Sequence, residues 1–537
     1  MNEKQAYLLK LLKEIDGICR ENDIRYYLAA GTMLGAIRHR GFIPWDDDAD
    51  IIMTKANYDK FIHFFETHKV KNRVFQYRGN NPLYPMIIGR YYDKESTGVQ
   101  RATGWDIIPA GQYIDVMILI PLPKEEKLKQ KTIERIIFYV ELNNDMYTDN
   151  GNRGDSYTRK YKWMLRLRKL VGKERLLKWL EKKIFCFSEE ECDEFMISHA
   201  IGNTLTFKKN FFGMPQYVPF EDTQLPIAEN YMDLFWYGYG SAWRMIPPEI
   251  EQQTHSVVDD FERPYSLYVG DYMRFLDKET VLSDVRKFKR TSVFNTNKKR
   301  PFSKEIHLIN AMQIKLQIED RIKREKIDLD EWIKERKFHA IKELFSPYFK
   351  LQFKKTFSYW GLFFDIDDEL LYYPLYMWVY YSGEYQRAEK ILKLRRREKG
   401  EILPERLKKL SELISMIIDT YRAYDYNERE RLKQLVSEGH KRYSEQVDFW
   451  LFYLRFLREN AEQEHDYRAL HGESIKMLRL FPENGDCMKY VADSYLGMGE
   501  TEKAMRFYEY AESLSRNGQL LCEIKDIKEG YKNEFAK

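Results

Sequence analysis

Cysteine is scarce in this chain of 537 residues, and long apolar runs are missing from it. The five cysteines are odd in number and have no close CxxC spacing, which argues against a disulfide framework and a zinc knuckle. No segment approaches the roughly 20 apolar residues needed to span a bilayer. Residues 1–23 show a charged helical pattern and lack the apolar core of a signal peptide. We therefore expect a cytoplasmic protein.

An excess of charge of one sign is also missing. The chain has 88 Lys and Arg against 84 Asp and Glu, which gives a net charge of +4. A general polyanion-coating role is unsupported, and no nucleic-acid partner is predicted. Hydrophobic residues at 44% and aromatic residues at 15% exclude a disordered chain, and the length predicts more than one domain.

The composition changes near residue 300. Most of the glycine and proline lies before this point, and residues 286–304 form a basic, polar stretch typical of a linker. We predict an α+β domain over residues 1–295, with a basic helical insertion over about 124–210, and an all-α domain over 296–537. Because every catalytic motif described below precedes the linker, we expect residues 1–300 alone to keep activity.

The second half carries a repeat-like signature. In the window 488–514, small and aromatic residues occupy the positions typical of a tetratricopeptide helix pair: Ala492, Tyr495, Gly499, Ala504, Tyr508 and Ala511. A looser match covers residues 371–394, and the spacing between the two is irregular. Such repeats either form a groove that binds a protein partner or serve as a plain helical scaffold, and both interpretations stay open.

An acidic cluster is the most informative feature of the first half. Residues 24–53 read as strand, turn, helix, loop and strand. Four acids lie at the entrance to the second strand: Asp46, Asp47, Asp48 and Asp50. Without a counter-ion such carboxylates repel and raise one another's pKa. Strand alternation predicts that Asp48 and Asp50 share a face and bind Mg²⁺ or Mn²⁺; a solvated acidic turn or adventitious calcium loop is the alternative.

A third acid and a phosphate-binding turn complete the predicted site. Asp115 interrupts the apolar strand 113–120, where a charge is expensive to bury unless it is paired or metal-bound. Gly31 and Thr32 stand at a strand-to-helix turn, where backbone N–H groups can face a phosphate. We predict that the three acids hold a metal that bridges this phosphate.

The run GTMLGAIRHRGFIPWDDDADI, residues 31–51, resembles the signature of the LicD family. This family comprises bacterial phosphocholine transferases of nucleotidyltransferase fold, related to fukutin-related protein. Residues 90–97, 113–123 and 219–255 resemble its further blocks, and nothing beyond about residue 300 does. The last block departs from the family pattern, since Tyr239-Gly240 is followed by Ser241-Ala242-Trp243 and Gln252 replaces a common Arg.

The resemblance implies transfer of a phospho-alcohol such as phosphocholine from a CDP-activated donor. The acceptor would be a sugar hydroxyl of a cell-surface glycan, such as lipopolysaccharide or teichoic acid, or of a lipid-linked polysaccharide. Asp48, Asp50 and Asp115 would be the catalytic, metal-binding residues. Seven residues would contact substrate: Gly31, Thr32, Arg38, His39, Trp45, Arg90 and His255. Structural roles for His39 and His255, and packing by Trp45, are the alternatives.

Two other functions stay open. The first is a nucleotidyltransferase that acts on a small alcohol or amine and releases pyrophosphate. The second is a non-catalytic interaction protein that binds its partner through the helical repeats.

The insertion contains a basic amphipathic segment, residues 159–185, with 11 Lys and Arg against 2 Glu. Such a helix can lie on an anionic membrane, which would place the protein at the inner face. We expect the more ordinary arrangement, a helix packed on its own domain with a solvated basic face.

Overall fold

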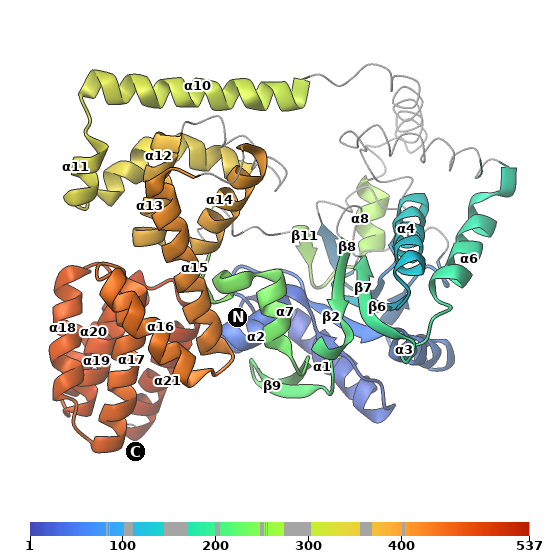
Figure 1. Ribbon diagram of the computed structural model, residues 1–537. Helices are drawn as coiled ribbons and strands as arrows, with labels where there is room; N and C mark the ends of the chain where they lie inside the picture. The colour runs from blue at the N-terminus through green and yellow to red at the C-terminus, as the bar shows by residue number, and fades with distance from the viewer. Residues whose placement is uncertain are drawn as a thin grey trace. The chain divides into compact units, whose positions relative to one another are not determined.

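A computed structural model describes residues 1–81, 84, 86–100, 111–143, 167, 170–198, 204–247, 252, 254, 256–272, 302–354, 368–399 and 403–535. The chain folds into two compact units, coloured in Figure 1 by position along the sequence. The sheet unit comprises Met1–Leu234 and Gln252–Lys299. The helical unit comprises Phe235–Glu251 and Arg300–Lys537.

A mixed sheet forms the centre of the sheet unit, in the order β1-β2-β6-β4-β3, with β7 beside β6 and β8 beside β7. Its strands are β1 (Tyr27–Leu28), β2 (Asp50–Thr54), β3 (Arg73–Gln76), β4 (Gly89–Asp93), β6 (Tyr113–Pro123), β7 (Cys192–Ser198) and β8 (Thr204–Lys208). Among the described strands of this sheet, β2 and β6 pair in parallel and the other pairs are antiparallel. The whole of β6 is buried, as expected of an apolar central strand. The predicted α+β class is confirmed.

Helices and two short hairpins complete the sheet unit. The helices are α1 (Glu3–Glu21), α2 (Ala30–His39), α3 (Lys55–Thr67), α4 (Glu126–Asn143), α6 (Lys173–Ile184), the first half of α7 (Tyr231–Gly238) and α8 (Tyr265–Tyr272). The additional strand pairs are β9 (Gln216–Phe220) with β10 (Thr223–Ile227), and β5 (Thr97–Gln100) with β11 (Ser256–Asp260). A capping box of Asn2 and Gln5 starts α1.

The helical unit contains no β-strand among its described residues. Its helices are α10 (Phe302–Glu325), α11 (Leu329–Lys334), α12 (Phe338–Lys354), α13 (Asp368–Met377), α14 (Tyr385–Lys399), α15 (Glu405–Asp425), α16 (Arg429–Arg442), α17 (Val447–Glu464), α18 (Arg468–Leu480), α19 (Gly485–Gly497), α20 (Thr501–Leu514) and α21 (Gly518–Phe535). The all-α prediction is confirmed. No helix in the described ranges is long and apolar enough to cross a membrane.

The predicted repeat window coincides with a helix pair. α19 and α20 enclose a turn at Gly499, whose φ of +80° favours glycine, and the small residues Ala492, Ala504 and Ala511 are fully buried. Small residues at these positions let the two helices pack closely. The assignment of the pair to the tetratricopeptide class stays a prediction.

Phe235–Glu251 packs within the helical unit through a buried aspartate. The indole N–H groups of Trp236 and Trp243 donate to Asp425 Oδ2 at 2.9 and 3.2 Å, and Arg244 forms an ion pair with the same carboxylate. Trp243 is 1% exposed. Our predicted domain over residues 1–295 assigns this segment to the first domain, whereas its core contacts lie in the helical unit.

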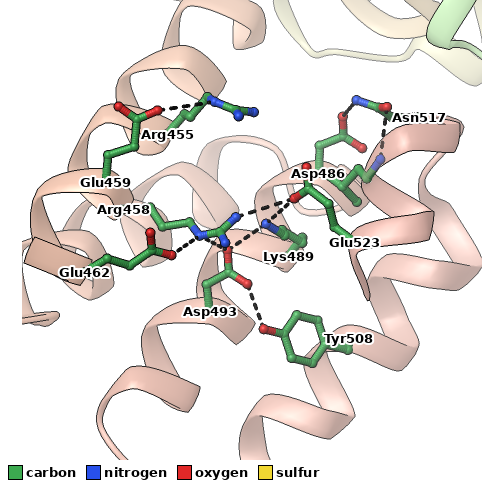
Figure 2. A network of polar contacts seen from close by, with 11 residues as sticks. Arg455, Arg458, Glu459, Glu462, Asp486, Lys489, Asp493, Tyr508, Asn517 and Glu523 are labelled. Carbon is green, nitrogen blue, oxygen red and sulfur yellow. Dashed lines mark hydrogen bonds and ion pairs between the residues drawn. The ribbon is translucent and has the colours of Figure 1, made fainter. Parts of the chain in front are cut away.

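A network of charged side chains joins the last helices, as Figure 2 shows. The buried Lys489 Nζ lies 2.9 Å from Asp493 Oδ2 and 2.9 Å from Glu523 Oε2. Arg458 lies 3.4 Å from both carboxylates, and the Tyr508 hydroxyl donates to Asp493 at 2.7 Å. Since an unpaired buried charge is costly, this network fixes α17, α19, α20 and α21 against one another.

We expect Lys489→Met to destabilise the helical unit by about 3 kcal/mol, because the change leaves two carboxylates without their buried cation. Lys503→Met is the matched control, since Lys503 is exposed and contacts Glu500 and the Tyr495 ring at the helix surface. Chemical denaturation followed by circular dichroism measures both. Equal effects of the two substitutions would contradict a structural role for the network.

Candidate active site

Three neighbouring strands place Asp50, Asp115 and Arg90 in one row. Asp50 of β2 is the register partner of Asp115 in β6, and Arg90 of β4 is its partner on the other side. Directly paired residues project from the same face of a sheet, so the three side chains are neighbours. The Arg90 Nε donates to Asp115 Oδ1 at 2.8 Å, and its guanidinium lies 3.9 Å from the centre of the Tyr113 ring. Arg90 therefore orients Asp115 and offsets part of its charge.

The other acids lie in the loop between α2 and β2. The strand begins at Asp50, so Asp48 precedes it, and strand alternation does not determine the direction of its side chain. Asp48 is half-buried and shares a hydrogen bond with the Asp46 carboxyl. Its charge also acts on Asp50. Asp46 and Asp48 thus reach the acidic cluster from the loop, where the alternation of strand side chains does not apply.

Burial and mutual repulsion dominate the electrostatics of this cluster. Burial raises the pKa of Asp50 well above its usual range, and the charges of Asp48, Asp115 and Asp46 raise it further, while Arg90 opposes them. Burial, followed by the charge of Asp48, raises the pKa of Asp46 to about 8. The buried Oδ1 of Asp50 has no hydrogen-bond partner among the described residues. The site therefore concentrates carboxylate oxygens that a single arginine does not balance.

The residues present fit a hard cation in their chemistry. Carboxylate oxygens are the preferred ligands of Mg²⁺. A cation would give Asp50 Oδ1 a partner and would reduce the repulsion between the acids. In the described ranges, however, no group of three or more His, Cys, Asp or Glu side chains is arranged to hold a metal ion. The metal site of Asp48, Asp50 and Asp115 stays a prediction.

Gly31 and Thr32 lie against the acids at the start of α2. The Thr32 hydroxyl accepts a hydrogen bond from the backbone N–H of Asp50 at 2.9 Å, which ties α2 to β2. A Cβ at Gly31 would stand 2.8 Å from Asp46 Oδ2, so glycine leaves room for that carboxyl. The N-cap residue of α2, Ala29, provides no side-chain hydrogen bond to the amino terminus of the helix. The turn thus meets the acidic cluster directly, and its role in binding phosphate stays a prediction.

Arg38, His39 and Trp45 pack on one another at the end of α2. The Arg38 Nε donates to His39 Nδ1 at 3.4 Å, and the His39 and Trp45 rings meet edge to face with centroids 6.2 Å apart. Burial, followed by the charge of Arg38, lowers the pKa of His39 to about 3. His39 is therefore neutral at physiological pH and does not serve as a protonated general acid.

Two segments far apart in sequence hold the acidic loop. The Gln5 side chain in α1 donates to the backbone oxygens of Ile43 and Asp46 at 3.0 and 2.9 Å. Glu221, in the β9–β10 turn, accepts from the Phe42 N–H at 3.0 Å, and its own N–H donates to the Arg40 oxygen. Sequence reasoning missed both residues, because a polar residue in an amphipathic helix or a turn gives no sign of such a distant partner.

Asp47 has a structural role in the same loop. Its carboxylate accepts a hydrogen bond from the Ser256 N–H at 2.8 Å. Lys4 Nζ lies 3.8 Å from Asp47 and 3.0 Å from Asp259, so it joins α1 to both segments. Asp47 thus anchors β11 to the acidic loop. His255, the next residue in sequence to Ser256, lies outside the described residues.

Comparison with known proteins assigns the sequence around this site to a family. The model of the LicD/FKTN/FKRP nucleotidyltransferase domain matches residues 23–95. The chain carries a LicD-family domain. This LicD-family domain contains most of the predicted site residues: Gly31, Thr32, Arg38, His39, Trp45, Asp48, Asp50 and Arg90. Asp115 and His255 follow it in sequence.

Individual relatives extend the similarity beyond the matched LicD-family domain. The chain is 25% identical over 284 residues to the lipopolysaccharide cholinephosphotransferase LicD of Haemophilus influenzae, which spans 49% of this chain and 97% of that protein. It is 46% identical over 101 residues to an uncharacterized protein of Rickettsia typhi, which spans 18% of this chain and 33% of that protein. Homology to LicD therefore reaches well past residue 95.

We expect Asp46→Asn to stabilise the metal-free protein more at high pH than at low pH. The folded pKa of about 8 lies above the unfolded value of about 3.9, so the folded state holds the extra proton between these values. Stability is therefore lost as the pH rises through this window, and asparagine removes that loss. Thermal unfolding in a chelator at about pH 5 and about pH 9 measures the difference.

The control for this substitution is Asp222→Asn, which removes an exposed acid paired with Lys13. We expect Asp46→Asn to raise the melting temperature by several degrees at the higher pH only. Equal shifts at both pH values would contradict the raised pKa.

Proposed function

We propose that this protein is a transferase that moves phosphocholine or a similar phospho-alcohol from a CDP-activated donor to a sugar hydroxyl. The acceptor is a cell-surface glycan or a lipid-linked polysaccharide. The observation that carries the proposal is the row of Asp50, Asp115 and Arg90 beside the LicD-family acidic loop. The similarity over 97% of the length of a lipopolysaccharide cholinephosphotransferase supports it.

In this proposal Asp48, Asp50 and Asp115 hold Mg²⁺ or Mn²⁺. Bound there, such a cation would supply positive charge to the diphosphate of the donor and to the leaving cytidine monophosphate. Arg90 keeps Asp115 in place through its 2.8 Å hydrogen bond. A carboxylate of the cluster accepts the proton of the attacking hydroxyl.

In this proposal the donor contacts residues at the start and at the end of α2. The uncapped amino terminus of α2, at Gly31 and Thr32, offers backbone N–H groups to a phosphate. Arg38 supplies positive charge beside Trp45, a half-buried residue whose ring would stack on a base. Neutral His39 has a buried Nε2 without a partner among the described residues, which suits a hydrogen bond to substrate.

A nucleotidyltransferase that acts on a small alcohol or amine is the second candidate, because the matching family model describes a nucleotidyltransferase domain. The same acids would serve both reactions. The products separate the two: phospho-alcohol transfer releases cytidine monophosphate, and nucleotidyl transfer releases pyrophosphate.

We expect Asp50→Asn to reduce release of cytidine monophosphate from CDP-choline by about 100-fold or more, because it removes the carboxylate that lies beside Asp115 and that we propose as a metal ligand. A chelator should abolish the activity of the unmodified protein, and Mg²⁺ should restore it. Asp222→Asn is the matched control and should keep full activity. Full turnover by Asp50→Asn in the presence of Mg²⁺ would refute the assignment.

The structure changes what is expected of a chain cut at residue 300. Such a chain lacks Asp425 and leaves Trp236, Trp243 and Arg244 without their buried partner. We expect it to aggregate. In the full chain, Asp425→Ala should lower the unfolding free energy of the helical unit by about 3 kcal/mol, because it leaves Arg244 buried and unpaired. An unchanged denaturation midpoint would contradict this role.

A further inference from the structure

Helix α6 buries one face against its own unit. Four apolar residues are buried where α6 packs against α4: Leu176, Leu177, Leu180 and Ile184. The acids of the helix are paired, since Arg78 lies 2.7 Å from Glu174 and 3.3 Å from Glu181. Glu181 also accepts from the Tyr139 hydroxyl at 2.7 Å. Packing therefore accounts for one face of α6 and for both of its acids, as expected of a helix that belongs to a globular core.

The opposite face of α6 is exposed, basic and aromatic. Lys178 and Trp179 lie three and four residues after Arg175, Lys182 lies four residues after Lys178, and Lys183 follows it. Trp179 is 51% exposed. None of the four cations forms an ion pair or hydrogen bond with a residue that the structure describes. Intramolecular packing thus explains neither the exposed tryptophan nor this concentration of positive charge.

Two further apolar side chains lie directly before this face. Leu170 is 84% exposed and Val171 is 41% exposed. Gly172, with a φ of +88°, makes the turn that separates them from the start of α6. An exposed leucine alone needs no explanation, but three large apolar residues beside four cations form a patch of mixed character. We call Leu170, Val171, Arg175, Lys178, Trp179, Lys182 and Lys183 the α6 outer face.

We propose that the α6 outer face docks on the surface of an anionic lipid bilayer. Tryptophan partitions to the boundary between headgroups and acyl chains, and the long stems of lysine and arginine lie along apolar surface while their charges reach lipid phosphates. The charges of this face complement an anionic leaflet. The contact is peripheral, because the apolar residues on the other side of α6 are already buried in the protein.

The composition of the face favours a bilayer over a soluble polyanion. A nucleic acid or an acidic protein segment would use the cations but would leave Leu170 and Val171 in water. A bilayer covers the apolar side chains and pairs the cations at the same time. This inference does not depend on the proposed function, because no residue of the α6 outer face belongs to the candidate active site.

Sedimentation of the full chain with vesicles tests the inference. We expect binding to vesicles of phosphatidylcholine and phosphatidylglycerol, weakening as salt is added, and little binding to phosphatidylcholine alone. The double substitution Lys178→Glu and Lys182→Glu should weaken binding by about tenfold or more. The matched control is Lys69→Glu with Lys71→Glu, an exposed lysine pair of the same unit.

The tryptophan has its own variant. Trp179→Ala should weaken vesicle binding severalfold, whereas Tyr510→Ala, which removes another exposed aromatic side chain, should not. All variants change exposed side chains, so melting temperatures should match the unmodified protein and confirm folding. Turnover of donor with a soluble acceptor should also be unchanged in every variant, which separates this inference from the proposed function.

Three outcomes would overturn the inference. Vesicle binding that survives the Lys178 and Lys182 substitutions would assign binding to another surface. Equal binding to neutral and anionic vesicles would exclude the electrostatic contact. Retention on heparin that depends on Lys178 and Lys182, without binding to anionic vesicles, would identify a site for a soluble polyanion instead.

Discussion

Mutual repulsion between buried carboxylates is the constraint on which the sheet unit is organised. The parallel pairing of β2 and β6 places Asp50 beside Asp115, and the loop before β2 adds Asp46 and Asp48. Isolated, this arrangement would be unstable, because each buried negative charge raises the cost of the next. Arg90, the Thr32 hydroxyl and the hydrogen bonds from Gln5 to the loop hold the acids together despite that cost. Clusters of titratable groups with strongly shifted pKa values occur most often at functional sites, because catalysis uses such groups.

The sequence predicted the parts of this site that depend on local pattern. The acidic cluster, the turn at Gly31 and Thr32 and the charged residue in an apolar strand are all visible within short windows. The pairing of Arg90 with Asp115 was not, because strand register is a nonlocal property. Strand alternation does not apply to Asp48, since the strand begins two residues later. The supports from Gln5 and Glu221 have no local signal, because their partners are backbone atoms of another segment.

In the helical unit, too, some features have a local signal in the sequence and others have none. The periodicity of its helices was evident, and so was the turn at Gly499. The buried Lys489 was not, because a lysine on an amphipathic helix reads as a solvent-facing residue until its neighbours are known. The sequence also carries no sign that Phe235–Glu251 belongs to the helical unit. Composition marks the linker near residue 300, but it does not mark this earlier segment.

The place of Phe235–Glu251 in the helical unit has a consequence for synthesis on the ribosome. Trp236 precedes its partner Asp425 by 189 residues. At translation rates of about 5–20 residues per second, roughly 10–40 s pass between the synthesis of Trp236 and the synthesis of Asp425. During that interval its aromatic side chains lack their burial site. The nascent chain therefore exposes an apolar segment of the kind that chaperones bind. The synthesis of Asp425 thus sets the earliest moment at which Trp236, Trp243 and Arg244 can pack against this carboxylate.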